Sequence, residues 1–372
     1  KLLLAVLVNQ ILISMIMYLR SNLAGLHLFK TDSIISVLDR LIMIVICGFL
    51  LLTHRDPGTF ELRWFVYAQT AAYIITFLIT FMIVIDKAKV RRFHWRWPFF
   101  VMILKKSYPY AVLVLLMTFY NRIDGVMLER MLPFREGAVE AGIYASAYRL
   151  LDAANMIAFL FAGLLLPIFA RMIKLRQHVE GMVRLSFSLL VVPALVVAIC
   201  CWFYSQELME LLYRGEHIDE SAAVFRILMC CFVPISSTYI FGTLLTANGS
   251  LRQLNLMATT GMLINILLNL YLIPRMEARG AAISSITTQL LTAIAQILMV
   301  QYIFRFKINY TLLVGLGAFA ASCIAWCWFI RGNELNWMLQ FGLAAAGCFA
   351  LALVTRLISP KNIYRIIRYD ES

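Results

Sequence analysis

Charged side chains occur inside two consecutive apolar stretches that are each long enough to cross a membrane. Arg122 and Asp124 lie in the first stretch, and Arg149 and Asp152 lie in the second. A charge near the centre of a bilayer costs about 2.5–3.5 kcal/mol, so these side chains must face a protein interior or a water-filled cavity. Arginine suits an anionic group, because its planar guanidinium stays charged and binds phosphate through two hydrogen bonds. Two interpretations are open: the carboxylates neutralise the arginines between packed helices, or at least one arginine is free to bind an anion.

Uncharged polar residues extend both stretches. Asn121 directly precedes the first arginine. Tyr148, Asp152 and Asn155 share one helix face, because they are spaced four and three residues apart. We therefore expect Asn121, Tyr148 and Asn155 to line a substrate site together with the two arginines.

A third charged pair, Asp39 and Arg40, lies in the apolar stretch 33–52. Side chains of adjacent helical residues point about 100° apart, so the two cannot both face one partner. We predict Arg40 as a further anion-binding residue. The three aspartates, Asp39, Asp124 and Asp152, are candidates for ion pairs with the arginines or for coupling to protons or sodium ions.

Further uncharged polar side chains lie in apolar stretches of the second half of the chain: Ser236, Ser237, Thr238, Asn265, Asn269, Ser284, Ser285, Thr287, Thr288, Gln289 and Gln296. Amide and hydroxyl groups in membrane helices ordinarily form hydrogen bonds from one helix to the next. The same groups match the hydroxyls of a sugar. We favour the helix-to-helix interpretation for this set.

The composition indicates a polytopic all-α membrane protein. Of the 372 residues, 62% are hydrophobic and 14% are charged, and the mean hydropathy is +0.83. Stretches of about 20 apolar residues, the length of a membrane-crossing helix, recur along the chain. We predict eleven membrane helices, at residues 2–19, 33–52, 64–85, 101–128, 139–170, 183–204, 222–246, 253–273, 280–304, 309–330 and 336–356. The eight cysteines all lie in apolar runs without the CxxC spacing of a metal site, so we predict no metal and no cofactor.

The net charge of +13 follows membrane topology rather than nucleic-acid binding, because most Lys and Arg residues lie in alternate loops. The positive-inside rule places these loops and the C-terminus in the cytoplasm. With an odd number of helices, the chain then begins on the outer face. Since the first residue is Lys1 rather than methionine, we expect an N-terminal truncation that removed an odd number of helices.

Four segments carry a family resemblance: NRIDGVMLERML, AGIYASAYRLLDAANMI, SIISVLDRLIM and ANGSLRQLN. They resemble bacterial polysaccharide transporters, the O-antigen and exopolysaccharide flippases of the MOP superfamily, which also contains lipid II flippases and MATE exporters. The resemblance implies a MATE-like bundle with two six-helix lobes facing a central cavity. It also implies fourteen helices in the full protein, of which the first three are missing here.

The resemblance divides the chain into three parts. Residues 1–100 would be the remainder of the N-terminal lobe (helices 4–6) with a basic cytoplasmic linker. Residues 101–305 would be the C-terminal lobe (helices 7–12), and residues 306–372 would add two helices and a basic cytoplasmic tail.

The resemblance further implies a flippase of the bacterial inner membrane that moves a polyprenyl-pyrophosphate-linked oligosaccharide by alternating access. The implied partners are this lipid-linked oligosaccharide, membrane lipid, H⁺ or Na⁺, and a glycan polymerase or chain-length machinery, with no nucleic acid. A MATE-type cation-coupled exporter is the alternative, followed by a membrane glycan-assembly enzyme and by a non-transporting scaffold. The sequence has no phosphate-binding glycine loop, no HExxH or GxSxG motif and no large loop, so we predict no enzyme activity.

Overall fold

The computed structural model describes residues 2–25, 28–53, 62–88, 97–213, 217–306, 310–355 and 357. In this part of the chain all regular structure is α-helical, which confirms the predicted fold class. The helices are α1 (Leu2–Gly25), α2 (Phe29–Thr53), α3 (Leu62–Ala88), α4 (Trp97–Met131), α5 (Phe134–Lys174), α6 (Glu180–Phe203), α7 (Ser205–Leu212), α8 (Ile218–Cys230), α9 (Phe232–Ala247), α10 (Leu251–Phe304), α11 (Tyr310–Arg331) and α12 (Trp337–Val354). Ten helical stretches among the described residues are long and apolar enough to cross a membrane.

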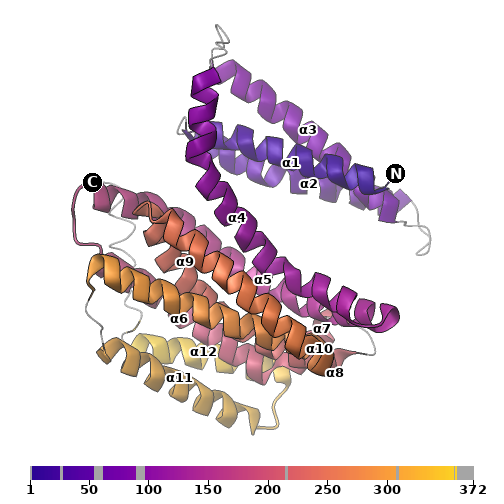
Figure 1. The fold of residues 1–372 in the computed structure, drawn as a ribbon. Coiled ribbons are helices and arrows are strands. Elements are labelled where there is room, and N and C mark those ends of the chain that lie inside the picture. Colours follow the sequence, from indigo (N-terminus) through magenta and orange to yellow (C-terminus); the bar gives the residue numbers. More distant parts are fainter. Residues whose placement is uncertain are drawn as a thin grey trace. The chain divides into compact units, whose positions relative to one another are not determined.

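The chain divides into two compact units, Lys1–Trp97 and Pro98–Ser372. The first unit is a bundle of α1, α2 and α3, drawn in indigo and purple in Figure 1. Arg20 Nε of α1 lies 2.7 Å from Asp32 Oδ1 of α2 and joins the two helices. Such polar links between apolar helices replace the hydrophobic driving force that lipid does not supply.

The second unit contains the larger core, built by α5, α6, α8, α9 and α10 around fully buried side chains such as Phe169, Leu228 and Leu244. The stretch predicted as one helix at residues 222–246 is divided between α8 and α9 at Cys231. Pro234 explains the break, because proline has no N–H to donate to the carbonyl four residues earlier and its ring clashes with that carbonyl.

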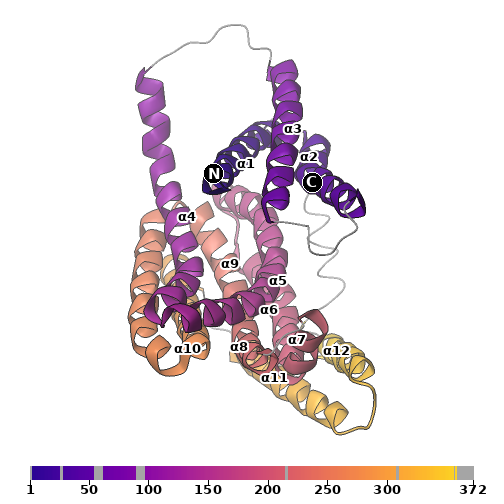
Figure 2. The same cartoon turned by 90° about the vertical axis from the view of Figure 1, so that its right-hand side faces the viewer.

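The helix α10 contains a tight reversal that the sequence prediction treated as a gap between two helices. Glu277 has φ 52° and ψ −132°, and the two arms of α10 run back along each other on either side of it (Figure 2). A Cβ atom on Gly280 would lie 2.5 Å from the carbonyl oxygen of Leu272, so the reversal requires glycine there. The carboxylate of Glu140, on α5, accepts a hydrogen bond from the N–H of Ala278 at 3.1 Å. The second arm therefore begins with a capped N–H group.

The last two helices pack against α6, next to which they lie in Figure 1. Their contact is made by small and apolar side chains that are fully buried, including Phe319 of α11 and Ala344 of α12. The gap between the predicted helices 183–204 and 222–246 is partly helical instead, because α7 buries Met209 and α8 begins at Ile218. Residues 89–96 of the predicted basic linker and residues 358–372 of the predicted basic tail lie outside the described residues.

Candidate functional site

The charged residues of α4 and α5 form an ion pair with an aromatic neighbour. Arg122 Nη2 lies 2.9 Å from Asp152 Oδ2, and the side chains of these two residues are 63% and 39% exposed. The guanidinium of Arg122 also lies 5.3 Å from the ring centre of Tyr148. The first interpretation, an arginine neutralised by a carboxylate of the other helix, therefore holds for this pair, although the pair is not buried.

Arg149 behaves differently. It is exposed on α5, and within the described residues it has neither an ion pair nor a side-chain hydrogen bond. The second interpretation, an arginine that is free to bind an anion, therefore fits Arg149.

Asp124 is the most buried charged side chain of the predicted site, at 1% exposure. Its Oδ2 accepts hydrogen bonds from the hydroxyls of Tyr144 at 2.7 Å and Ser285 at 2.5 Å. Its Oδ1 accepts one from the amide of Asn269 at 2.6 Å, and that amide also donates to Asn265 Oδ1 at 3.1 Å. The carboxylate thus joins α4 to α5 and to both arms of α10 without an arginine.

This cluster matters for the position of α4, because Asp124 and Leu128 are the residues of α4 that are buried. A further polar link is the hydrogen bond from Asn255 Nδ2 of α10 to the carbonyl oxygen of Pro109, at 3.1 Å. The helix that carries Arg122 is therefore held by polar groups together with partly buried apolar side chains such as Leu113 and Met127.

The remaining predicted pair lies on α2 in the first unit. The carboxylate of Asp39 contacts the next residue of its own helix. Its Oδ1 accepts a hydrogen bond from the backbone N–H of Arg40 at 2.8 Å, and its Oδ2 lies 3.8 Å from Arg40 Nε. The side chain of Arg40 is 59% exposed. The two residues thus contact each other along α2, and the role of Arg40 in anion binding stays a prediction.

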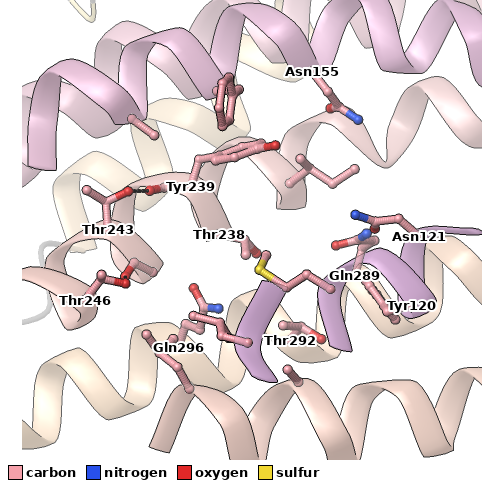
Figure 3. Close-up of a pocket in the computed structure, with 18 of the residues that line it drawn as sticks. Tyr120, Asn121, Asn155, Thr238, Tyr239, Thr243, Thr246, Gln289, Thr292 and Gln296 are labelled. Atoms are coloured by element: carbon pink, nitrogen blue, oxygen red, sulfur yellow. Dashed lines mark hydrogen bonds between the residues drawn. The ribbon is translucent and has the colours of Figure 1, made fainter. Parts of the chain in front are cut away.

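A cavity of about 300 Å³ lies between α4, α5, α9 and α10 (Figure 3). Its polar lining consists of Tyr120, Asn121, Asn155, Thr238, Tyr239, Thr243, Thr246, Gln289, Thr292 and Gln296. Of the predicted substrate-binding residues, Asn121 and Asn155 belong to this lining, whereas Arg122, Arg149 and Tyr148 do not. Thr238, Gln289 and Gln296 stood out in the sequence as polar residues in apolar helices but were interpreted as helix-to-helix links.

The described residues contain one group of side chains with the spacing of a metal site. The Sγ atoms of Cys200, Cys327 and Cys348, from three helices, all lie within 4.8 Å of one another. They pack among fully buried apolar side chains such as Val192 and Phe319. No sequence spacing could show this group, because α6, α11 and α12 supply one thiol each.

The fold and site define a polytopic helical membrane protein with charged and polar groups inside its membrane helices. Residues 1–173 match the family model "Polysaccharide biosynthesis protein". The structure is similar to "Lipid II flippase MurJ, inward closed conformation", with a TM-score of 0.74 at 13% sequence identity over 96% of this chain and 73% of that chain. No curated protein matches the chain. The family model therefore covers slightly less than half of the chain, and the similarity to the flippase structure shows a shared fold.

Proposed function

We propose that this protein is a flippase that moves a polyprenyl-pyrophosphate-linked oligosaccharide across the bacterial inner membrane by alternating access. The match to a polysaccharide biosynthesis family and the fold shared with a lipid II flippase support this class of function. The observation that carries the substrate assignment is the exposed charged face of α4 and α5.

The charged face consists of Arg122, Arg149 and Asp152, on two helices that are long and apolar enough to cross a membrane. Hydrocarbon does not tolerate exposed charges, so this face borders water. Asp152 offsets Arg122, and Arg149 leaves the face with a net positive charge. The face therefore suits an anionic head group such as a pyrophosphate.

The pyrophosphate–sugar head cannot cross hydrocarbon unaided, whereas the polyprenyl chain can stay in lipid. Arg149 is the residue that binds the phosphate groups, and Arg122 assists while it keeps Asp152 as its partner. The cation exporter alternative needs carboxylates that are open to water and unpaired. Asp152 is paired and Asp124 is buried, so the anionic substrate is favoured.

Asp124 is the candidate for coupling to H⁺ or Na⁺. Its carboxylate already receives hydroxyl and amide dipoles from α5 and from both arms of α10. A change in the ion bound there would alter the hydrogen bonds that hold α4, the helix that carries Arg122. Ion binding and the position of an anion-binding residue are thereby linked through one helix.

The test uses the full-length protein in a bacterial strain that lacks its flippase for one surface glycan. We expect the wild type to restore the glycan, and Arg149→Ala to fail at normal membrane abundance. Arg171→Ala is the matched control, because Arg171 is an exposed arginine near the end of the same helix, away from the charged face. Restoration by Arg149→Ala as complete as by the wild type would refute the substrate assignment. Failure of the wild type in every glycan strain would refute the proposed function.

A further inference from the structure

We infer that the cavity between α4, α5, α9 and α10 binds an uncharged sugar residue of the lipid-linked substrate. This inference rests on the proposed function and specifies its substrate. The cavity measures about 300 Å³, at the lower end of the range in which proteins hold small ligands, about 300–1,000 Å³. That volume fits a single sugar residue rather than an entire oligosaccharide.

The polar groups of the cavity are uncharged amides and hydroxyls. No Asp, Glu, Lys, Arg or His occurs among the described residues that line it. A carboxylate placed there would lose its hydration without gaining a cation, which costs free energy. A neutral sugar carries no charge and avoids this cost. The lining therefore discriminates against acidic sugars.

The buried oxygen atoms of the lining that lack a hydrogen-bond partner within the described chain include Asn155 Oδ1, Thr238 Oγ1 and Gln296 Oε1. Gln296 is only 5% exposed, so bulk water does not compensate it. Buried polar groups in native proteins are nearly always paired, and unpaired ones mark a place that a ligand or water fills. A hydrocarbon chain would leave all three unpaired, whereas sugar hydroxyls both donate and accept.

Apolar and aromatic side chains complete the walls. The rings of Phe159 and Tyr239 meet edge to face with centroids 6.4 Å apart, and Tyr120 lies on the α4 side (Figure 3). Such surfaces pack against the C–H groups of a pyranose ring while the amides bind its hydroxyls. The combination fits a neutral hexose or N-acetylhexosamine.

The cavity and the charged face share the same two helices. Asn121 lines the cavity and directly precedes Arg122, and Asn155 lines it three residues after Asp152. A sugar–phosphate head can therefore place its phosphate at the charged face and its sugar in the cavity. The sugar that the cavity takes is accordingly one near the pyrophosphate.

Two variants remove the sugar site by different means. Gln296→Leu keeps the size of the side chain and removes its amide. Gly163→Met fills the cavity, because a Cβ atom at Gly163 meets nothing within 4 Å and the residue is part of the lining. Gly142→Met is the matched control, since a Cβ there is equally unhindered on the same helix but Gly142 does not line the cavity.

The measurement is the dissociation constant of the purified full-length protein for three lipids. These are polyprenyl pyrophosphate without sugar, with N-acetylglucosamine, and with glucuronic acid. We expect the N-acetylglucosamine lipid to bind about ten-fold more tightly than the other two, a difference of about 1.4 kcal/mol. Gln296→Leu and Gly163→Met should lose this preference and keep the affinity for the sugar-free lipid, whereas Gly142→Met should keep both.

Equal affinities for the three lipids, or a preference that survives in Gly163→Met, would overturn the sugar site alone. A loss of affinity for the sugar-free lipid in Gly163→Met would show that the cavity holds the polyprenyl chain, which also overturns it. Failure of the wild type to bind any of the three lipids would overturn the proposed function and the sugar site together.

Discussion

The buried carboxylate of Asp124 should be the main anchor of α4, and replacing it should lower the stability of the protein measurably. Asp124→Ala removes an acceptor of three hydrogen bonds, from Tyr144, Ser285 and Asn269. Hydrogen bonds between membrane helices contribute about 0.6 kcal/mol on average and up to about 1.7 kcal/mol each. For three bonds we expect the free energy of unfolding to fall by about 2–5 kcal/mol.

The assay is a titration of the purified protein with a denaturing detergent in mixed micelles, followed by circular dichroism. Asp152→Ala is the control, because it removes the other intramembrane carboxylate of the site, which is partly exposed and pairs with Arg122. An exposed ion pair contributes about 0–1 kcal/mol, so this variant should lie close to the wild type. Asp124→Asn should fall between the two, since it keeps one acceptor oxygen and places an amide N–H against a donor.

If Asp124→Ala and Asp152→Ala lower the stability equally, by less than about 1 kcal/mol, the anchoring argument fails. The apolar face of α4 would then hold the helix, despite its few buried residues. The readout is stability rather than transport, so it separates this structural role from any role of Asp124 in ion coupling.

Two further predictions concern the reversal of α10 and use thermal unfolding of the purified protein. Gly280→Ala should lower the melting temperature by several degrees, because the new Cβ would lie 2.5 Å from the carbonyl oxygen of Leu272; Gly142→Ala, with open space at its Cβ, should not. Glu140→Ala should cost about 1 kcal/mol, the typical value of a helix cap, because the N–H of Ala278 loses its acceptor. Glu140→Gln retains a carbonyl oxygen and should recover most of the stability that Glu140→Ala loses. If Glu140→Gln is as unstable as Glu140→Ala, the charge of Glu140 matters rather than its hydrogen bond.

The positions of the membrane helices could be predicted from the sequence, because apolar stretches of sufficient length are a local signal. The reversal near Glu277 was also visible, since Pro274 and Gly280 bracket a short polar segment between two such stretches. The division at Cys231 was not predicted, although Pro234 supplies its cause. Apolar residues continue through that position without a polar gap, so the hydrophobicity pattern does not show where the helix breaks.

The partners of the charged residues could be predicted only in part. The sequence left open whether the carboxylates neutralise the arginines. The structure shows such an ion pair between Arg122 and Asp152. The partners of Asp124 lie up to 161 residues away along the chain. Helix periodicity shows which residues share a face, but it does not show which helices are neighbours. Asn269 and Ser285 were therefore predicted to link helices, but the sequence did not show that both donate to Asp124.

The neutral partners of Asp124 determine the net charge of the proposed substrate site. Had Asp124 paired with Arg149, both Arg122 and Arg149 would have a carboxylate partner, and the exposed charged face would be neutral. The hydroxyls and the amide around Asp124 satisfy its carboxylate inside the helix bundle instead. The positive charge of Arg149 is therefore left without a partner among the described residues, on a face that hydrocarbon cannot cover. The buried network and the exposed arginine are thus two parts of one arrangement, because the neutral side chains that bind Asp124 leave Arg149 free for an anion.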